Sequence, residues 1–196
     1  MRLFVALAVP EGPRREAARR VEAVRGALPP ARWVDLATLH LTLVFLGDVG
    51  GTQGSGLSGL AAGLARACAP HRPFELRLAG GGTYPPRRPA RVAWMGIEAG
   101  GELAALQAEV ARAAGAALAG SGYEPETRAY HPHVTLARCS DPWPPAAAEA
   151  FAAAFAGPIG EPFAAARAVL VESRLGAGGA RHREAASFPL QGAERA

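Results

Sequence analysis

The chain has 196 residues, enough for one domain or two small lobes that enclose a real hydrophobic core. Hydrophobic residues make up 49% and charged residues 19%, which excludes a disordered chain, and no apolar stretch approaches the roughly 20 residues needed to span a bilayer. The net charge is +4 and all 21 basic residues are arginines, so the charge permits an RNA partner without requiring one.

The first part of the chain alternates predicted strands and helices. A strand is predicted over 2–9, and it is followed by a helix whose apolar residues recur at helical spacing until Pro29 and Pro30 end it. The apolar run within 31–49 predicts a second strand. A helix over 57–69 and a half-buried strand over 74–80 follow.

The rest of the chain continues the same alternation. In order, its pattern predicts a loop at 81–89, a strand at 91–98, a helix at 102–119, a strand from 133, a helix at 146–156, a strand at 169–173, and a hairpin or loop with a final strand at 174–190. This order repeats loosely in each half and predicts an α+β fold of two pseudo-symmetric lobes, each an antiparallel sheet with outer helices. Without a strong linker, we expect one domain over 1–196 in which the two lobes intertwine.

Two strand-like segments carry the same short motif. HLTL begins at His40 and HVTL begins at His133. Side chains alternate along a strand, so His40 and Thr42 share one face, as do His133 and Thr135. If an approximate twofold axis relates the two halves, both pairs can face a shared central cleft.

Two imidazoles and two hydroxyls suit the hydrolysis of a phosphodiester. The attacking water must lose a proton and the departing oxygen must gain one, and histidine can do either near neutral pH. Threonine hydroxyls can hold the phosphate oxygens without a metal. Two other interpretations stay open: the histidines are structural, or His131 and His133 bind zinc, although such a site usually needs a third protein ligand.

The paired motifs resemble the 2H phosphoesterase superfamily, which His-x-Thr pairs define. HLTLVFLG and PHVTLAR look like its branch of RNA 2′,3′-cyclic phosphodiesterases, also described as 2′-5′ RNA ligases. The similarity runs nearly end to end, through LFVALAVP, GGTYPPRRPARVAWMGIE and the closing LVESRLGAGGARHREAASFPL. The closing segment departs from the family pattern, because it has His182 where relatives often have tyrosine.

The resemblance implies a fold of two α+β lobes around a cleft and an activity without metal or nucleotide cofactor. That activity opens a terminal 2′,3′-cyclic phosphate of RNA to a 2′-phosphomonoester. The alternatives are 2′-5′ ligation of tRNA-half-like ends and an RNA-end-binding module with little turnover. The resemblance further implies that His40 gives a proton to the departing 3′-oxygen and that His133 activates water. The pseudo-symmetry of the two halves leaves this assignment open. Thr42 and Thr135 would hold the phosphate.

Three further residues are candidates for substrate binding. Arg138 ends the second motif and can favour phosphate. Strict alternation puts it on the face opposite His133, so it reaches the cleft only if the strand twists or bulges before Cys139, and a structural salt bridge is the alternative. Tyr130 and Tyr84 can stack on a base or belong to the core. Five arginines are candidates for lining the mouth of the cleft, and the alternative is that they are ordinary solvent-exposed residues. They are Arg87, Arg88, Arg91, Arg181 and Arg183.

The two cysteines, Cys68 and Cys139, form neither a disulfide framework nor a metal-type pair. The apolar start ends at Pro10 and leads into a charged segment, which favours a first strand over a signal peptide. We therefore expect a cytoplasmic protein. A monomer is the default for a cleft enclosed within one chain.

Overall fold

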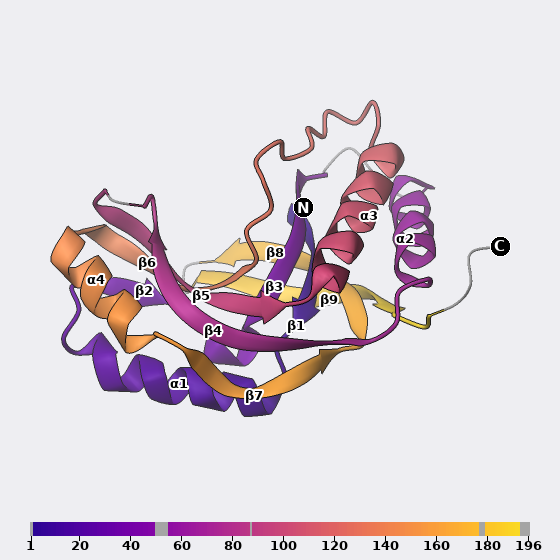
Figure 1. The fold of residues 1–196 in the computed structure, drawn as a ribbon. Helices are drawn as coiled ribbons and strands as arrows, with labels where there is room; N and C mark the ends of the chain where they lie inside the picture. The colour runs from indigo at the N-terminus through magenta and orange to yellow at the C-terminus, as the bar shows by residue number, and fades with distance from the viewer. Residues whose placement is uncertain (1, 50–54, 87, 177–178, 193–196) are drawn as a thin grey trace.

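A computed structural model describes residues 2–49, 55–86, 88–176 and 179–192 (Figure 1). These residues form nine strands, four α-helices and one 3₁₀ turn. In chain order the elements are β1 (Arg2–Ala8), α1 (Glu11–Arg25), β2 (Ala31–Trp33), η1 (Leu36–Thr38), β3 (His40–Asp48), α2 (Ser55–Cys68), β4 (Phe74–Tyr84), β5 (Ala90–Ala99), α3 (Gly101–Ala117), β6 (His133–Trp143), α4 (Pro145–Ala154), β7 (Pro158–Ala165), β8 (Arg167–Gly176) and β9 (Gly179–Pro189).

The strands form two antiparallel sheets. The first sheet has the order β3-β1-β8-β9 and the second has the order β2-β6-β5-β4-β7. Each sheet therefore contains one motif strand, β3 or β6, and these two strands contact each other. The predicted α+β fold of two lobes is confirmed.

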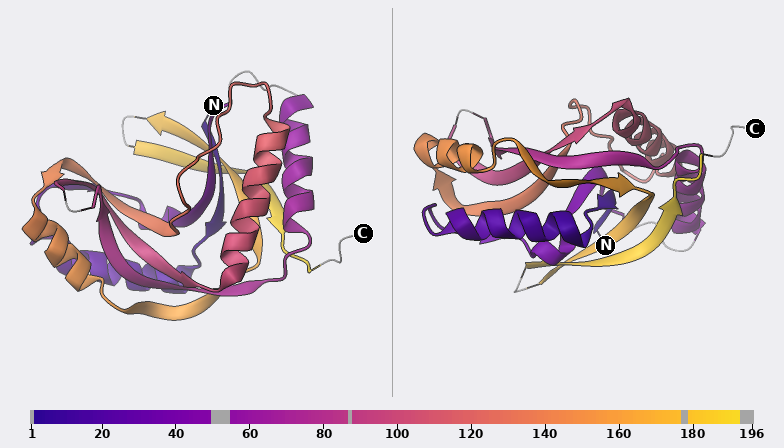
Figure 2. Two further views of the ribbon diagram at one scale, coloured as in Figure 1. Left: turned by 45° about the horizontal axis from the view of Figure 1, so that its top comes forward. Right: turned by 60° about the horizontal axis from the view of Figure 1, so that its bottom comes forward.

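Two of the four helices, α1 and α3, pack on the sheet of the other lobe. Helix α1 follows β1 of the first sheet but packs on β7 of the second, while α4 packs on β4 and β5. Helix α3 follows β5 of the second sheet but packs with α2 and against β3 of the first (Figures 1 and 2). In the described parts of the chain, no helix is long and apolar enough to cross a membrane.

Most of the core is one buried cluster that joins both sheets and all four helices. Leu7 of β1, Leu106 of α3, Val134 of β6 and Phe151 of α4 belong to it, and each is at most 1% exposed. A smaller buried cluster on the cleft side of the first sheet consists of Phe4, Ala6, Val169 and Val171. The cleft residues therefore project from rigid, packed strands.

Three stretches differ from the prediction. The segment 31–49, predicted as one strand, is divided into β2, η1 and β3, because Asp35 caps a 3₁₀ turn between the strands. The predicted loop at 81–89 is wrong in its first part, because β4 continues to Tyr84. The glycines serve close packing: a Cβ on Gly81 would lie 2.5 Å from Phe155 Cβ, and one on Gly82 would lie 2.3 Å from the Trp94 ring. Strand β7 was not predicted, since its glycine and prolines conceal the strand pattern.

Candidate active site

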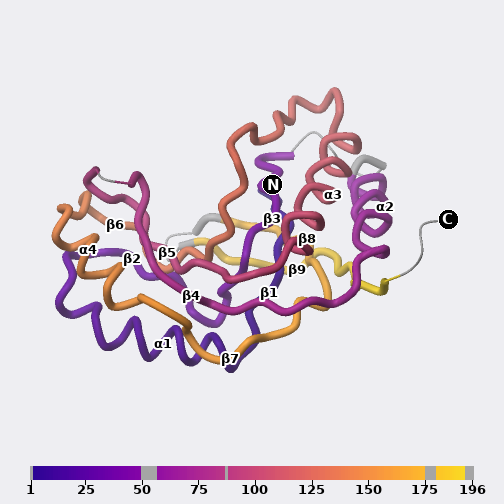
Figure 3. The backbone as a smooth tube through the Cα atoms, viewed as in Figure 1, coloured from indigo at the N-terminus to yellow at the C-terminus, as the bar shows by residue number. Residues whose placement is uncertain are grey.

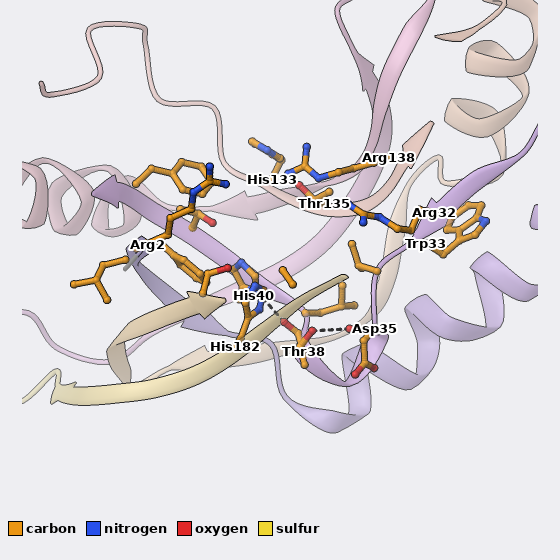
Figure 4. A pocket seen from close by; sticks show the side chains of 18 of the residues that line it. Arg2, Arg32, Trp33, Asp35, Thr38, His40, His133, Thr135, Arg138 and His182 are labelled. Atoms are coloured by element: carbon orange, nitrogen blue, oxygen red, sulfur yellow. Dashed lines mark hydrogen bonds between the residues drawn. The ribbon is translucent and has the colours of Figure 1, made fainter. Parts of the chain in front are cut away.

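A cleft of about 580 Å³ lies between the two sheets. His40 and Thr42 of β3 line it, as do His133 and Thr135 of β6 (Figure 4). The remaining walls come from β1, the segment from β2 to η1, and the β8–β9 hairpin. The structure thus brings both predicted pairs to one cavity.

Each motif strand has a β-bulge at the leucine of its motif. Val5 and Ala6 of β1 face Val44 and Thr42, which leaves Leu43 as the extra residue. In β6 the extra residue is Leu136, since Ala93 faces Ala137 and Trp94 faces Thr135. Two consecutive residues are therefore buried in each strand, and the residue that follows them turns back to the cleft.

The Leu136 bulge overturns the alternation argument for Arg138. Strict alternation places this side chain on the face opposite His133 and makes a bulge the condition for reaching the cleft; with the bulge present, Arg138 is exposed and lines the cleft. Its cross-strand partner on β2 is Arg32, which lines the cleft as well. Two guanidinium groups on neighbouring strands next to Thr135 have the charge and the donors that an anion such as phosphate requires.

The two histidines are held in the same way. The Nδ1–H of His40 donates to the carbonyl of Thr38 at 2.8 Å, and that of His133 donates to the carbonyl of His131 at 2.7 Å. A carbonyl can only accept, so the proton of each neutral ring lies on Nδ1. Each Nε2 is then left to accept or deliver a proton.

The surroundings favour the neutral form of both rings. Burial lowers the pKa of His40, the bond to the Thr38 carbonyl partly opposes this, and the charge of His182 lowers the pKa further. Burial likewise lowers the pKa of His133, with an opposing carbonyl bond and a further lowering by His131. Either ring can serve as a base near neutral pH, and either gives up its proton more readily than an ordinary imidazolium once it is protonated.

Aromatic rings fix the orientation of both imidazoles. His40 stacks on Phe4, with 4.7 Å between the ring centroids. His133 lies 5.7 Å from Tyr84 and 6.1 Å from Trp94. Each catalytic candidate is therefore held by aromatic rings, but the rings differ between the two sides of the cleft.

The tyrosine candidates lie beside the cleft and are not among its lining residues. The ring of Tyr84 packs against the ring of His133, and the ring of Trp94 lies 5.6 Å from that of Tyr84. The Tyr130 hydroxyl donates to the Thr42 carbonyl at 3.0 Å, and its ring packs against the core. These positions fit structural roles better than stacking on a base.

The four arginine candidates for the cleft mouth that the structure describes do not line the cleft. Arg183 binds the buried carboxylate of Glu172 at 2.7 Å, and Arg87 lies outside the described residues. Arg88, Arg91 and Arg181 are exposed and do not line the cleft.

Sequence reasoning missed Phe45. This ring is 67% exposed, the only large hydrophobic side chain among the described residues that is so exposed, and it lines the cleft 6.2 Å from Phe4. It holds in the first motif the position that Arg138 holds in the second, five residues after the histidine. The two aligned segments, HLTLVF and HVTLAR, place Phe45 and Arg138 at the same sixth position. Only the bulges show that this position faces the cleft.

The zinc interpretation finds little support. The rings of His131 and His133 lie 6.3 Å apart, and His131 sits edge-on to Trp94 at 5.1 Å. Across the described ranges, no three His, Cys, Asp or Glu side chains gather as a ligand set. The pair would need a third ligand that these residues do not supply.

The chain is similar to proteins of known class. The family model described as the 2′-5′ RNA ligase superfamily matches residues 13–177. An RNA 2′,3′-cyclic phosphodiesterase from Methanothermobacter thermautotrophicus is 31% identical over 142 residues, which cover 72% of this chain and 73% of the relative.

Solved structures agree. A crystal structure of a Thermus thermophilus protein has a TM-score of 0.78 and 29% identity, and the match covers 99% of this chain and 100% of that one. Escherichia coli LigT complexed with 3′-AMP has a TM-score of 0.69 and 26% identity, with 96% of each chain covered. The family match, the confirmed fold and the motif positions agree, and the chain belongs to the 2′-5′ RNA ligase superfamily, the 2H phosphoesterases that its paired motifs resemble.

Proposed function

We propose that this protein is an RNA 2′,3′-cyclic phosphodiesterase that opens a terminal cyclic phosphate to a 2′-phosphomonoester by metal-free acid–base catalysis. One observation carries the proposal: two histidines from separate sheets line one cleft, and each has its Nδ1–H bound to a backbone carbonyl. The name of the Methanothermobacter relative supports the substrate class.

In the proposed reaction, Nε2 of His133 takes a proton from water as the water oxygen attacks phosphorus. The bond from phosphorus to the 3′-oxygen breaks, and the proton on Nε2 of His40 moves to that oxygen. The products are a 3′-hydroxyl and a 2′-phosphate. The assignment of acid and base follows the family resemblance.

The negative charge of the substrate helps to place the protons. Both rings favour the neutral form in the free protein because burial lowers the pKa of each. A bound phosphate diester puts a negative charge beside them and favours protonation of one ring. The cleft then holds one imidazolium and one neutral imidazole.

The other lining residues suit the rest of the substrate. Thr42, Thr135 and the Arg32–Arg138 pair can hold the non-bridging oxygens. Phe45 presents an exposed ring on which the terminal base can stack. We therefore expect RNA ends or cyclic nucleotides as partners. We also expect a monomer inside the cell, where the free Cys68 and Cys139 stay reduced.

The first test replaces each histidine with alanine and measures hydrolysis of a nucleoside 2′,3′-cyclic phosphate. His40→Ala and His133→Ala should each lower kcat by about 10²- to 10⁴-fold, the usual contribution of an acid or a base. His131→Ala is the matched control, and it should retain most of the activity. An excess of chelator should leave the hydrolysis rate of the unmodified protein unchanged. Loss of activity with chelator and with His131→Ala would instead establish a metal site.

Product analysis separates the alternatives. Phosphorus NMR of the product should show the phosphate on the 2′-oxygen. Supplying an RNA with a 5′-hydroxyl end alongside a cyclic-phosphate end tests ligation, which would give a 2′-5′ linkage that hydrolysis does not. Salt-dependent RNA binding without any product would establish a binding module and overturn the proposal.

A further inference from the structure

His182 is a third histidine of the cleft, and it lies beside His40. It comes from β9, yet its ring is 5.2 Å from the ring of His40 and 5.2 Å from that of Phe4, edge-on to both. Phe4 in turn stacks on His40 at 4.7 Å. The three rings form one cluster, to which β1, β3 and β9 each contribute one. Figure 4 shows His40 and His182 side by side.

We propose that His182 is a positioning residue that sets the proton affinity of His40 and, with it, the pH range in which the protein works. The link to pH range rests on the proposed function, in which His40 is the acid. The link between the two imidazoles does not, because it is a property of the free protein.

The physical reason is repulsion between neighbouring imidazolium ions. Two unit charges about 5 Å apart in a partly buried site disfavour each other, so the pair takes up its first proton more readily than its second. Burial lowers the pKa of His182, and the pKa of His40 is lowered both by burial and by the charge of His182. Phe4 can stabilise one imidazolium through its π face but does not relieve the repulsion between two.

Other charges on this face do not replace this pairing. Glu184, the next residue of β9 on the face of His182, is bound to Arg167 at 2.8 Å. Arg2 of β1 also lines the cleft, with a guanidinium group. The charged and polar groups around the cluster are Arg2 from β1, His40 and Asp48 from β3, Asp35 from the segment before η1, Ser173 from β8 and Glu184 from β9. Among them, His40 is the one imidazole, and its ring is in contact with that of His182.

The test changes the charge at position 182 and follows the titration of His40 itself. His182→Gln removes the charge, and His182→Lys makes it permanent. NMR of the imidazole resonances of the free protein gives the midpoint of His40 in each variant. The midpoint should rise with glutamine and fall with lysine, each by about half to one pH unit. The basic limb of the kcat/KM profile should move in the same order.

The controls separate charge from structure. His131→Gln should shift His133 and leave the midpoint of His40 in place, because His131 lies beside the other ring. Thermal unfolding confirms that each variant is folded, and His182→Asn replaces the glutamine variant if that one is not. A midpoint of His40 that stays fixed, or that moves the same way with glutamine and lysine, overturns the inference. If the midpoint moves as expected in a protein that lacks activity, the proposed function fails and this inference stands.

Discussion

At the scale of single residues, the two histidines are near-equivalent, and this equivalence sets the pH behaviour. Each holds its proton on Nδ1 against a carbonyl two residues earlier, and the pKa of each is lowered below 6.5, chiefly by burial. The productive free protein has one ring protonated and the other neutral. The population of that state is greatest midway between the two pKa values.

The kcat/KM profile should therefore be bell-shaped, with its optimum on the acid side of pH 6.5. The pH dependence of the residual activity of each alanine variant shows which histidine is the acid and which is the base. A protein without its base loses the acidic limb, and a protein without its acid loses the basic limb. His133→Ala should thus lose the acidic limb and His40→Ala the basic one. The opposite pattern would exchange the two roles, and an optimum above pH 7 would contradict the lowered pKa values.

Phe45 offers a second test at this scale. Its exposure means that removing the ring should barely change stability, whereas stacking on a base is worth about 1–3 kcal/mol. Phe45→Ala should raise KM for a cyclic nucleotide by roughly 5- to 150-fold. KM for a base-free ribose 2′,3′-cyclic phosphate is the control, and it should stay the same. Equal effects on both substrates would show that Phe45 shapes the cleft and does not bind the base.

At the scale of elements, the two bulges decide which residues meet the substrate. The motifs, most of the elements and the fold class follow from the sequence because they depend on local patterns. The position of Arg138 does not, since period-two alternation fails at Leu136 and nothing in HVTLAR marks the extra residue. The continuation of β4 through Gly81 and Gly82 was hidden for a related reason. Those glycines are explained only by Phe155 and Trp94, which are distant in sequence.

The cross-strand arginine pair gives a prediction in which stability and binding change in opposite directions. Arg32 and Arg138 are direct partners on β2 and β6, and like charges in that position destabilise a sheet. Arg32→Gln should therefore raise the free energy of unfolding by a few tenths of a kcal/mol. It should also weaken inhibition by inorganic phosphate, by roughly tenfold or more, because a charge-assisted hydrogen bond is lost.

The matched control is Arg91→Gln, on an exposed arginine of β5 that does not line the cleft. It should change neither quantity beyond error. Calorimetry in phosphate-free buffer and competition by phosphate measure the two effects. If Arg32→Gln lowers stability, the pair is not in repulsion and Arg32 has a structural role.

At the scale of the whole molecule, the cleft depends on how the lobes are joined. Helices packed on the opposite lobe and one shared core hold the sheets together. The segment between α3 and β6 passes close to β3 (Figure 3), and its Tyr130 donates to the carbonyl of Thr42. Strand β3 is an edge strand, and the next carbonyl, of Leu43, accepts from Gln107 of α3 at 3.4 Å. Side chains of the other half of the chain thus cover the free edge that carries the first motif.

Tyr130→Phe should lower the free energy of unfolding by about 1 kcal/mol, the usual net worth of a hydrogen bond between neutral groups. Tyr123→Phe removes a hydroxyl from the same connecting segment and should cost less than about 0.5 kcal/mol. Denaturant unfolding measures both. Tyr130→Phe tests only the hydroxyl, because phenylalanine stacks on a base as well as tyrosine does.

Tyr130→Leu tests the ring, which either joins the lobes or stacks on the base of the substrate. If the ring joins the lobes, this variant loses stability, and KM changes alike for cyclic nucleotides and for the base-free ribose 2′,3′-cyclic phosphate. A KM raised only for substrates with a base would return Tyr130 to the binding surface.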